Sequence, residues 1–269
     1  MTPDLLATVW PKLALYLGAA LLVGGVAARR VLTPGHPGLV WLGVGLALLL
    51  LGGASGVYFT LAGLGFTAPA DLLDYLTGTG AGRAVLILWM GALVLLAAEI
   101  AELSWLAALG ASGVLLWGLA GIGHGASHGQ LTHVLHGLHA GAMCLWVGGV
   151  FALLTRRRAT AVLARKFTPY ALGSVLTLGI SGVWMSLEHT GNLLLLPASA
   201  YGRTLLLKLA WVGLALLAAV IVRRAFAVGQ GVRPRLIGEA LTLLAVLGVT
   251  ASLSGQAPPT HSATEHSGH

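Results

Sequence analysis

The sequence predicts an all-α integral membrane protein folded as a bundle of eight transmembrane helices. Of its 269 residues, 57% are hydrophobic and only 9% are charged, so polar side chains are too few to cover a water-soluble globule of this size. Apolar stretches follow one another along the chain, each close to the roughly 20 residues that a helix needs to cross a bilayer. Glycines recur inside these stretches, as is typical of membrane helices that pack closely. The lipid bilayer is therefore the expected solvent.

Eight apolar stretches are predicted to span the membrane, and the first is expected to be a retained helix. Its arginine pair follows the apolar run, whereas the charges of a secretory signal precede it. Only Glu102, Leu103 and Ser104 separate the third stretch from the fourth, which implies a tight hairpin. The predicted spans are residues 10–28, 39–61, 84–101, 105–122, 131–154, 170–187, 205–222 and 237–253.

Arginine and lysine residues gather on one side of the predicted bundle. Eleven of the 15 basic residues lie in connections that an even number of spans places on the same side. Short basic loops are typical of the cytoplasmic face, so both termini are expected outside. The same distribution argues against nucleic acid as a partner, although the net charge is +7. The eleven residues are Arg29, Arg30, Arg156, Arg157, Arg158, Arg165, Lys166, Arg223, Arg224, Arg233 and Arg235.

Two segments outside the spans carry further expectations. Residues 67–82 hold two aspartates among leucines and are expected to form a short interfacial helix. Residues 1–255 are predicted to form the transmembrane domain, and residues 256–269, rich in Pro, Ser and His, a disordered tail outside the membrane. The pair Gly82-Arg83 recurs 120 residues later as Gly202-Arg203. This recurrence indicates two parallel four-helix halves, although small residues at helix starts explain it equally well.

Five histidines lie within 16 residues, at the end of the fourth predicted span and along the fifth. Histidine inside a membrane is costly to bury and usually functional. At about 100° per residue, the ligand-type side chains of the fifth span fall on one helix face about 140° wide. These side chains are His133, His136, His139, Met143 and Cys144. They extend about 15 Å along the helix axis, which predicts a ladder of small sites instead of one mononuclear site.

Imidazole and thioether side chains together are the ligands expected for copper. No carboxylate lies in the run, which argues against Ca²⁺, Mg²⁺ and Mn²⁺ and favours Cu(I), with Cu(II) as the alternative. Met185 and His189, four residues apart near the end of the sixth span, would add ligands from a second helix, although a lone interfacial Met or His is more often structural. The predicted copper ligands are His124, His128, His133, His136, His139, Met143, Met185, His189, His261, His266 and His269.

The remaining polar residues of the spans have structural explanations. Glu239 is expected to pair with Arg235 one turn earlier, a role favoured over proton coupling. Lys208 is expected to extend toward the membrane surface. Most tryptophans are expected in the aromatic belts at the membrane surfaces. The sequence has no Gly-x-Ser-x-Gly, His-Glu-x-x-His or P-loop motif, so an enzyme is not expected.

The second half of the sequence resembles the copper resistance protein D (CopD) family of bacterial inner-membrane proteins. The matching elements are Gly123-His124-Gly125, the run from His139 to Gly149, Phe167 with Ala171, the run from Tyr201 to Lys208, and Glu239 with Pro258-Pro259. The resemblance implies an eight-span inner-membrane protein that moves copper between periplasm and cytoplasm, with a periplasmic copper-binding protein of the CopC type as a partner. It marks His124, His139 and Glu239 as family-like positions. The chain departs from the pattern in its additional histidines.

Three functions follow from these patterns. The first is copper uptake, homeostasis or resistance, in which the outer histidines acquire the ion and His136, His139 and Met143 pass it inward. The second is a b-type haem electron carrier, because histidines on facing helices can bind haem axially. The third is a factor that delivers copper to a membrane oxidase.

Overall fold

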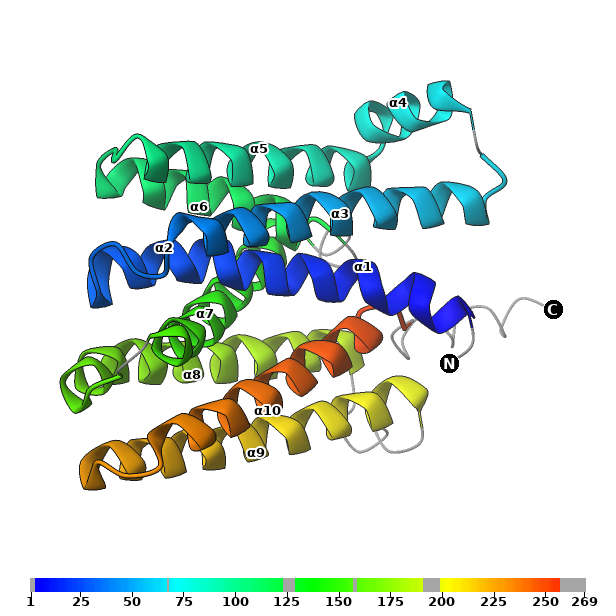
Figure 1. Cartoon of the computed structure of the whole chain (residues 1–269). Helices are drawn as coiled ribbons and strands as arrows, with labels where there is room; N and C mark the ends of the chain where they lie inside the picture. Colours follow the sequence, from blue (N-terminus) through cyan, green and yellow to red (C-terminus); the bar gives the residue numbers. More distant parts are fainter. Residues whose placement is uncertain (1–2, 67, 123–128, 157–158, 191–198, 257–269) are drawn as a thin grey trace.

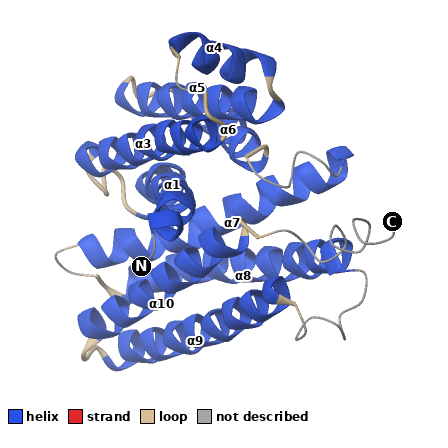
Figure 2. Ribbon diagram, turned by 90° about the vertical axis from the view of Figure 1, so that its right-hand side faces the viewer, coloured by secondary structure: helices blue, strands red, loops and turns tan. Residues whose placement is uncertain are grey.

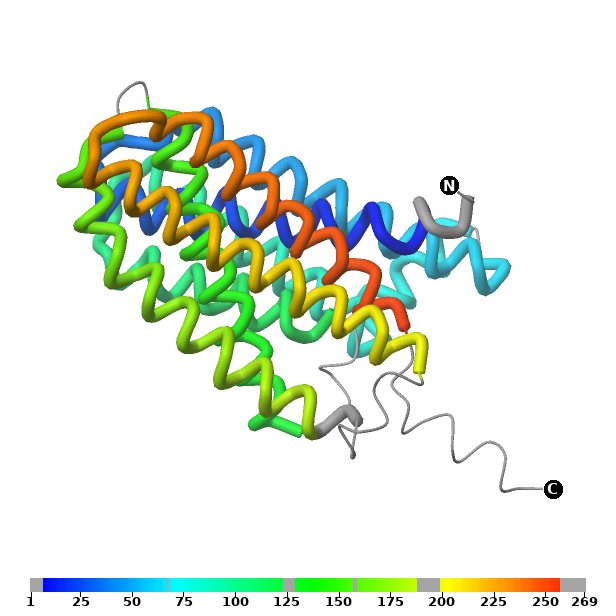
Figure 3. Tube along the Cα trace, turned by 90° about the horizontal axis from the view of Figure 1, so that it is seen from below, coloured from blue at the N-terminus to red at the C-terminus, as the bar shows by residue number. Residues whose placement is uncertain are grey.

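The computed structural model describes residues 3–66, 68–122, 129–156, 159–190 and 199–256, and within these ranges the chain is all-α (Figure 1). The helices lie side by side, and their connections gather at the two ends of the bundle (Figure 3). The all-α part of the predicted fold class is confirmed. Along the chain the elements are α1 (Pro3–Ala19), η1 (Ala20–Gly24), α2 (Gly25–Ala27), η2 (Ala28–Leu32), α3 (Leu39–Gly63), α4 (Pro69–Gly78), α5 (Gly80–Ile100), α6 (Trp105–Ala120), α7 (Gly129–Thr155), α8 (Ala161–Thr190), α9 (Ala200–Val228) and α10 (Val232–Leu253), where η1 and η2 are π-helical turns.

Seven helical segments of the described chain are long and apolar enough to cross a membrane. They are Ala7–Leu32, Leu39–Gly63, Gly80–Ile100, Gly129–Thr155, Ala161–Leu187, Ala200–Val228 and Val232–Leu253. The remaining predicted span corresponds to α6, which is apolar but only 16 residues long, or about 24 Å. The chain is therefore a multi-span helical membrane protein.

Two predictions about the connections are confirmed. Helices α5 and α6 form the expected hairpin, in which Glu102 adopts a positive φ of 51°. The expected short helix is α4, whose start is fixed by a hydrogen bond from the Ala68 backbone N–H to the Asp71 carboxylate, 2.9 Å long. Leu72 and Leu73 of α4 are exposed, as suits a helix that lies in the membrane interface.

Several helices continue past the apolar stretches that predicted them. Helix α8 begins at Ala161 instead of residue 170, and α9 ends at Val228 instead of residue 222. Arg165 and Lys166 therefore lie in the first turns of α8, not in a loop. Hydropathy marks only the part of a helix that contacts lipid tails, whereas long basic side chains allow the helix to continue into the interface.

The bundle has two groups of helices on either side of α1 and α7. Helices α3, α5 and α6 lie on one side, and α8, α9 and α10 on the other (Figures 1 and 2). Each side has its own cluster of buried apolar side chains, and Met143 of α7 packs against both clusters. Thr79 and Ser199 each accept a 2.9 Å hydrogen bond from the glycine N–H three residues later, but Ser104 and Thr160 cap α6 and α8 in the same way, so these caps do not mark two halves.

The π-helical turn η1, which continues α1, crosses α7 at glycine. A Cβ atom on Gly24, in the π-helical turn η1, would lie 2.0 Å from the Cys144 carbonyl oxygen and 2.8 Å from the Gly148 Cα. A Cβ atom on Gly148 would lie 2.5 Å from the Gly24 Cα. The two backbones therefore touch, which only small residues permit.

One end of the bundle, here called the cation-rich end, carries the 33–38 loop, the α5–α6 hairpin and the α9–α10 turn (Figure 1). Arg29 and Arg30 each place Nε 2.8 Å from a different carboxylate oxygen of Glu99 on α5. Arg29 also donates to the Gly35 and Pro37 carbonyls at 2.8 Å. The arginines that mark topology in the sequence thus also hold α1, α5 and the 33–38 loop together.

The opposite end, here called the histidine-rich end, is where α5, α7 and α9 begin and α10 ends (Figure 3). Lys12 of α1 donates a 2.7 Å hydrogen bond to the Ser254 carbonyl just after α10. The first and the last helix therefore have their outer ends at the same end of the bundle.

Substitution of Gly24 by alanine is expected to destabilise the protein by about 1–3 kcal/mol, because the added methyl group has no space at the crossing. Thermal unfolding in detergent measures this effect. Gly113→Ala on α6 is the matched control, since a Cβ atom there has no neighbour within 4 Å. Equal melting temperatures for the two variants would contradict the tight crossing.

His36 is expected to make stability depend on pH. Burial, and then the nearby Arg156 and Arg29 charges, lower its pKa below the ordinary 6.5, although its hydrogen bond to the Ala152 carbonyl acts in the opposite direction. The folded state therefore resists protonation, so this stability is present above about pH 6.5 and is lost as the pH falls through the lowered pKa. The melting temperature of His36→Gln should fall less than that of the wild type between about pH 7 and pH 5. Melting temperatures that fall equally with pH in the two proteins would refute this contribution of His36 to stability.

Candidate functional site

Helix α7 lies at the centre of the bundle and carries the predicted histidine ladder, but the structure directs its side chains to different neighbours. His133 contacts α6, where its Nε2 donates to the Trp117 carbonyl at 3.0 Å. His139 contacts Ser181 on α8. The single face predicted from the sequence is therefore divided between two sides of α7.

The hydrogen bonds of His139 assign its tautomer. Its Nδ1 lies 2.9 Å from the Ser181 Oγ, and the Ser181 hydroxyl donates its one proton to the Thr177 carbonyl. The serine oxygen must then accept, so Nδ1 carries the hydrogen and Nε2 carries the lone pair. A metal-ligating histidine is held in this way, with one ring nitrogen bonded to the protein and the other directed at the ion.

His136 has the same tautomer, one turn toward the histidine-rich end. Its Nδ1 lies 2.8 Å from the Thr132 carbonyl, which can only accept, so Nε2 again carries the lone pair. Met143 lies one turn inward from His139 and is partly buried between the two apolar clusters. We call His136, His139 and Met143 the α7 ladder, which covers about 10 Å along the helix.

Cys144 is separated from this ladder. It is fully buried in the apolar cluster of the first half, and its carbonyl faces Gly24 of η1. Its place on the predicted ligand face therefore reflects packing at the α1–α7 crossing.

The prediction that Glu239 pairs with Arg235 is wrong. The Glu239 carboxylate accepts a 3.2 Å hydrogen bond from the Trp146 indole N–H, whereas Arg235 donates to the Gln230 carbonyl at 2.7 Å. Glu239 points into the bundle, where it is 4% exposed, and Arg235 turns back to the α9–α10 connection. Trp146 and Trp89 also depart from the aromatic-belt prediction, since Trp89 donates to the Leu49 carbonyl inside the bundle.

Lys208 on α9 is half-buried and lies near enough to His139 to interact with it electrostatically. The sequence predicted that this side chain extends toward the membrane surface. A resident ammonium group repels a monovalent ion half as strongly as a divalent ion, because Coulomb energy scales with the product of the charges. Lys208 therefore places a basic side chain beside His139.

The other predicted ligands are less defined. Met185 is half-buried on α8, one turn from Ser181 toward the histidine-rich end. The described residues contain no group of three His, Cys, Asp or Glu side chains that could hold a metal ion. Helix α6 ends at Ala120. His124, His128, the His189 side chain, His261, His266 and His269 lie outside the described part of the structure.

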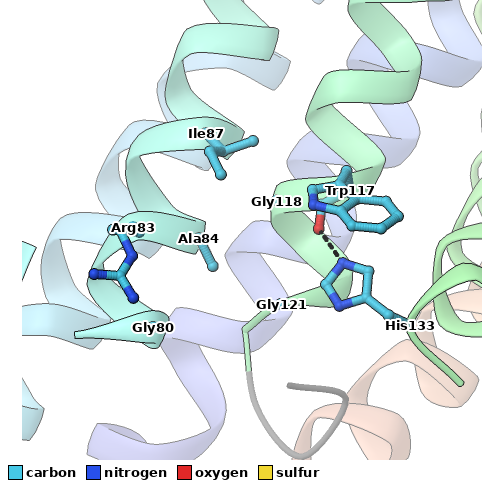
Figure 4. Close-up of a pocket in the computed structure, with 8 residues that line it drawn as sticks. All are labelled: Gly80, Arg83, Ala84, Ile87, Trp117, Gly118, Gly121 and His133. Atoms are coloured by element: carbon cyan, nitrogen blue, oxygen red, sulfur yellow. Dashed lines mark hydrogen bonds between the residues drawn. The ribbon is translucent and has the colours of Figure 1, made fainter. Parts of the chain in front are cut away.

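A pocket of about 250 Å³ lies between α5, α6 and the start of α7 (Figure 4). Arg83 lines it across from His133, whose ring lies 4.1 Å from that of Trp117, and small residues form the walls between them. Arg83 is exposed, and its guanidinium donates to the Thr77 carbonyl at 3.2 Å. His133 therefore belongs to this pocket, apart from the α7 ladder.

Sequence reasoning missed Ser181 and Trp146. A serine in mid-helix has little signal of its own, because its hydroxyl also bonds readily to its own helix. Trp146 carried a usable signal, since it lies well inside an apolar span and not at its end. Glu239, a carboxylate within an apolar span, carried another, and it was assigned the wrong partner.

Replacing Ser181 by alanine is expected to weaken copper binding at His139 by about 10- to 100-fold, since the ring loses the acceptor that fixes its tautomer. Titration of the purified protein with Cu(I) against a competing chelator measures this change. Ser186→Ala on the same helix is the control, because that hydroxyl donates to the Gly182 carbonyl of α8 itself. Equal affinities in the two variants would show that Ser181 does not support the site.

Comparison of the chain with protein-family models, with curated proteins and with solved structures finds no match. The assignment of a function therefore depends on the chemistry and geometry of the residues themselves. By its sequence and structure, the chain is a multi-span helical membrane protein with histidine and methionine side chains along its central helix.

Proposed function

We propose that the protein moves copper across a bacterial inner membrane, as a copper-uptake, homeostasis or resistance protein of the CopD type. The observation that carries the proposal is the geometry at His139, whose Nδ1 is bonded to Ser181 and whose Nε2 carries the lone pair. With His136 and Met143 it forms a sequence of ligand atoms along α7. Imidazole and thioether are ligands that copper, above all Cu(I), prefers.

A ladder of incomplete sites suits passage of an ion. Transport requires binding that is strong enough for capture and weak enough for release to the next position. His136 and His139 lie three residues apart, and Met143 lies four residues further, so successive ligands are neighbours on one helix surface. The Lys208 charge near His139 weakens the hold on the ion further and favours the monovalent form.

The proposed topology has eight spans, with α6 as the short one. The cation-rich end faces the cytoplasm, by the tendency of basic loops to remain there, and both termini are periplasmic. The histidine-rich end then faces the periplasm, where the tail histidines and a CopC-type protein would supply copper. Exit at the cation-rich end completes the path.

Purified protein with His136→Ala and His139→Ala is expected to bind less copper per chain than the wild type, and cells that produce it should accumulate a different amount of copper. Metal analysis and X-ray absorption of the purified protein measure both the stoichiometry and the ligand atoms. His133→Ala is the control, because His133 lies in the Arg83 pocket, apart from the ladder.

Unchanged copper in both the purified protein and the cells would refute the proposal. A Soret band in the purified protein would instead support the haem carrier. Loss of oxidase activity without a change in cellular copper would support the delivery factor.

A further inference from the structure

Glu239 is a buried carboxylate without a basic partner among the described residues. Only 4% of the residue is exposed, and the hydrogen bond from Trp146 is neutral. Glu99, the other buried carboxylate of the described chain, is held between two arginines. Burying an unpaired charge in the apolar layer of a membrane is costly, and residues that persist there usually serve ion or proton pathways.

The charged and titratable groups on the surrounding helices do not neutralise Glu239. Arg235 on its own helix donates to the Gln230 carbonyl. Arg29 and Arg30 are engaged by Glu99, and Lys12 donates to the Ser254 carbonyl at the other end of α1. On α9, Lys208 lies near His139, and Arg223 and Arg224 are exposed. On α7, His139 is about two turns away.

A second buried polar group lies at the same depth. His139 on α7 faces Ser181 on α8. Because the two helices are antiparallel, seven residues toward the cation-rich end lead to Trp146 on α7 and to Ser174 on α8. Gly149 lies against the Phe167 ring, so α7 and α8 remain in contact past this level. The Ser174 hydroxyl is 3% exposed and has no hydrogen-bond partner among the described residues. A buried hydroxyl without a protein partner is rare, and it adds a polar group to this part of the α7–α8 contact.

This polar level continues the α7 ladder. His139, Met143 and Trp146 lie within about 60° of one another around α7, at successive turns. An ion that leaves Met143 toward the cation-rich end would next reach the level of Trp146, Glu239 and Ser174. A cation in the apolar layer needs a compensating negative charge, and Glu239 is the carboxylate placed to provide it.

We propose that Glu239 exchanges a proton for the transported cation, so that passage of Cu(I) is coupled to proton movement in the opposite direction. With the path empty, the carboxyl group is protonated and neutral. When Cu(I) arrives, the O–H bond breaks, the proton leaves, and the carboxylate balances the charge of the ion. One positive charge replaces another, and no electron is transferred. This inference depends on the proposed copper transport and links its rate to the pH difference across the membrane.

Proteoliposomes that contain a pH-sensitive dye test the exchange. Cu(I), kept reduced with ascorbate, is added outside, and internal copper and internal pH are followed together. The wild type should move copper inward and protons outward, with a rate that increases when the interior is more acidic. Glu239→Gln should lower this flux at least tenfold and remove its dependence on the pH gradient, while X-ray absorption in detergent still shows copper bound by the imidazole ligands of the α7 ladder. Glu102→Gln, in the exposed α5–α6 hairpin, should behave as the wild type.

Trp146→Phe is a second variant that retains the carboxyl group. It removes the indole hydrogen bond that favours the charged form, so the half-maximal flux should move to higher pH. Copper flux and proton movement in Glu239→Gln equal to those of the wild type would overturn the exchange but leave copper transport intact. A wild-type protein that binds and moves no copper would overturn both proposals.

Discussion

The contact on which the rest of the structure depends is the crossing of α1 and α7 at Gly24 and Gly148. Because the two backbones touch there, α7 is fixed in the centre of the bundle, between the two groups of helices. Its rotation is fixed as well, since Cys144 must face α1. His139 and Trp146 are then directed toward α8 and α10, where Ser181 and Glu239 meet them.

The two buried carboxylates show how one bundle treats the same group in two ways. Glu99 forms ion pairs with two guanidinium groups, which join helices at the cation-rich end. Breaking such a buried arrangement from one side is strongly destabilising. Glu239 has only a neutral donor, so its charge can change without breaking an ion pair. The ion-paired carboxylate therefore lies on α5, and the carboxylate without an ion pair lies on α10.

The sequence predicted the elements well and their contacts poorly. Composition and apolar stretches indicated the all-α membrane fold, the α5–α6 hairpin and α4, because these depend on local physical chemistry. The ends of α8 and α9 were misplaced, since hydropathy records lipid contact and not backbone hydrogen bonding. The partners of His139 and Glu239 depend on how separate helices are rotated against one another. The periodicity of a single helix identifies its face, but not the neighbour to which that face is turned.

The length of α6 bears on how an ion would reach the ladder. At 16 residues it is shorter than its neighbours, and a helix of about 24 Å falls short of a hydrocarbon layer of about 30 Å. Such hydrophobic mismatch is relieved by local thinning of the bilayer. Since α6 ends toward the histidine-rich end, the thinned region adjoins the first turns of α7. In the proposed transport, such thinning would shorten the low-dielectric distance that an ion crosses before it reaches His139.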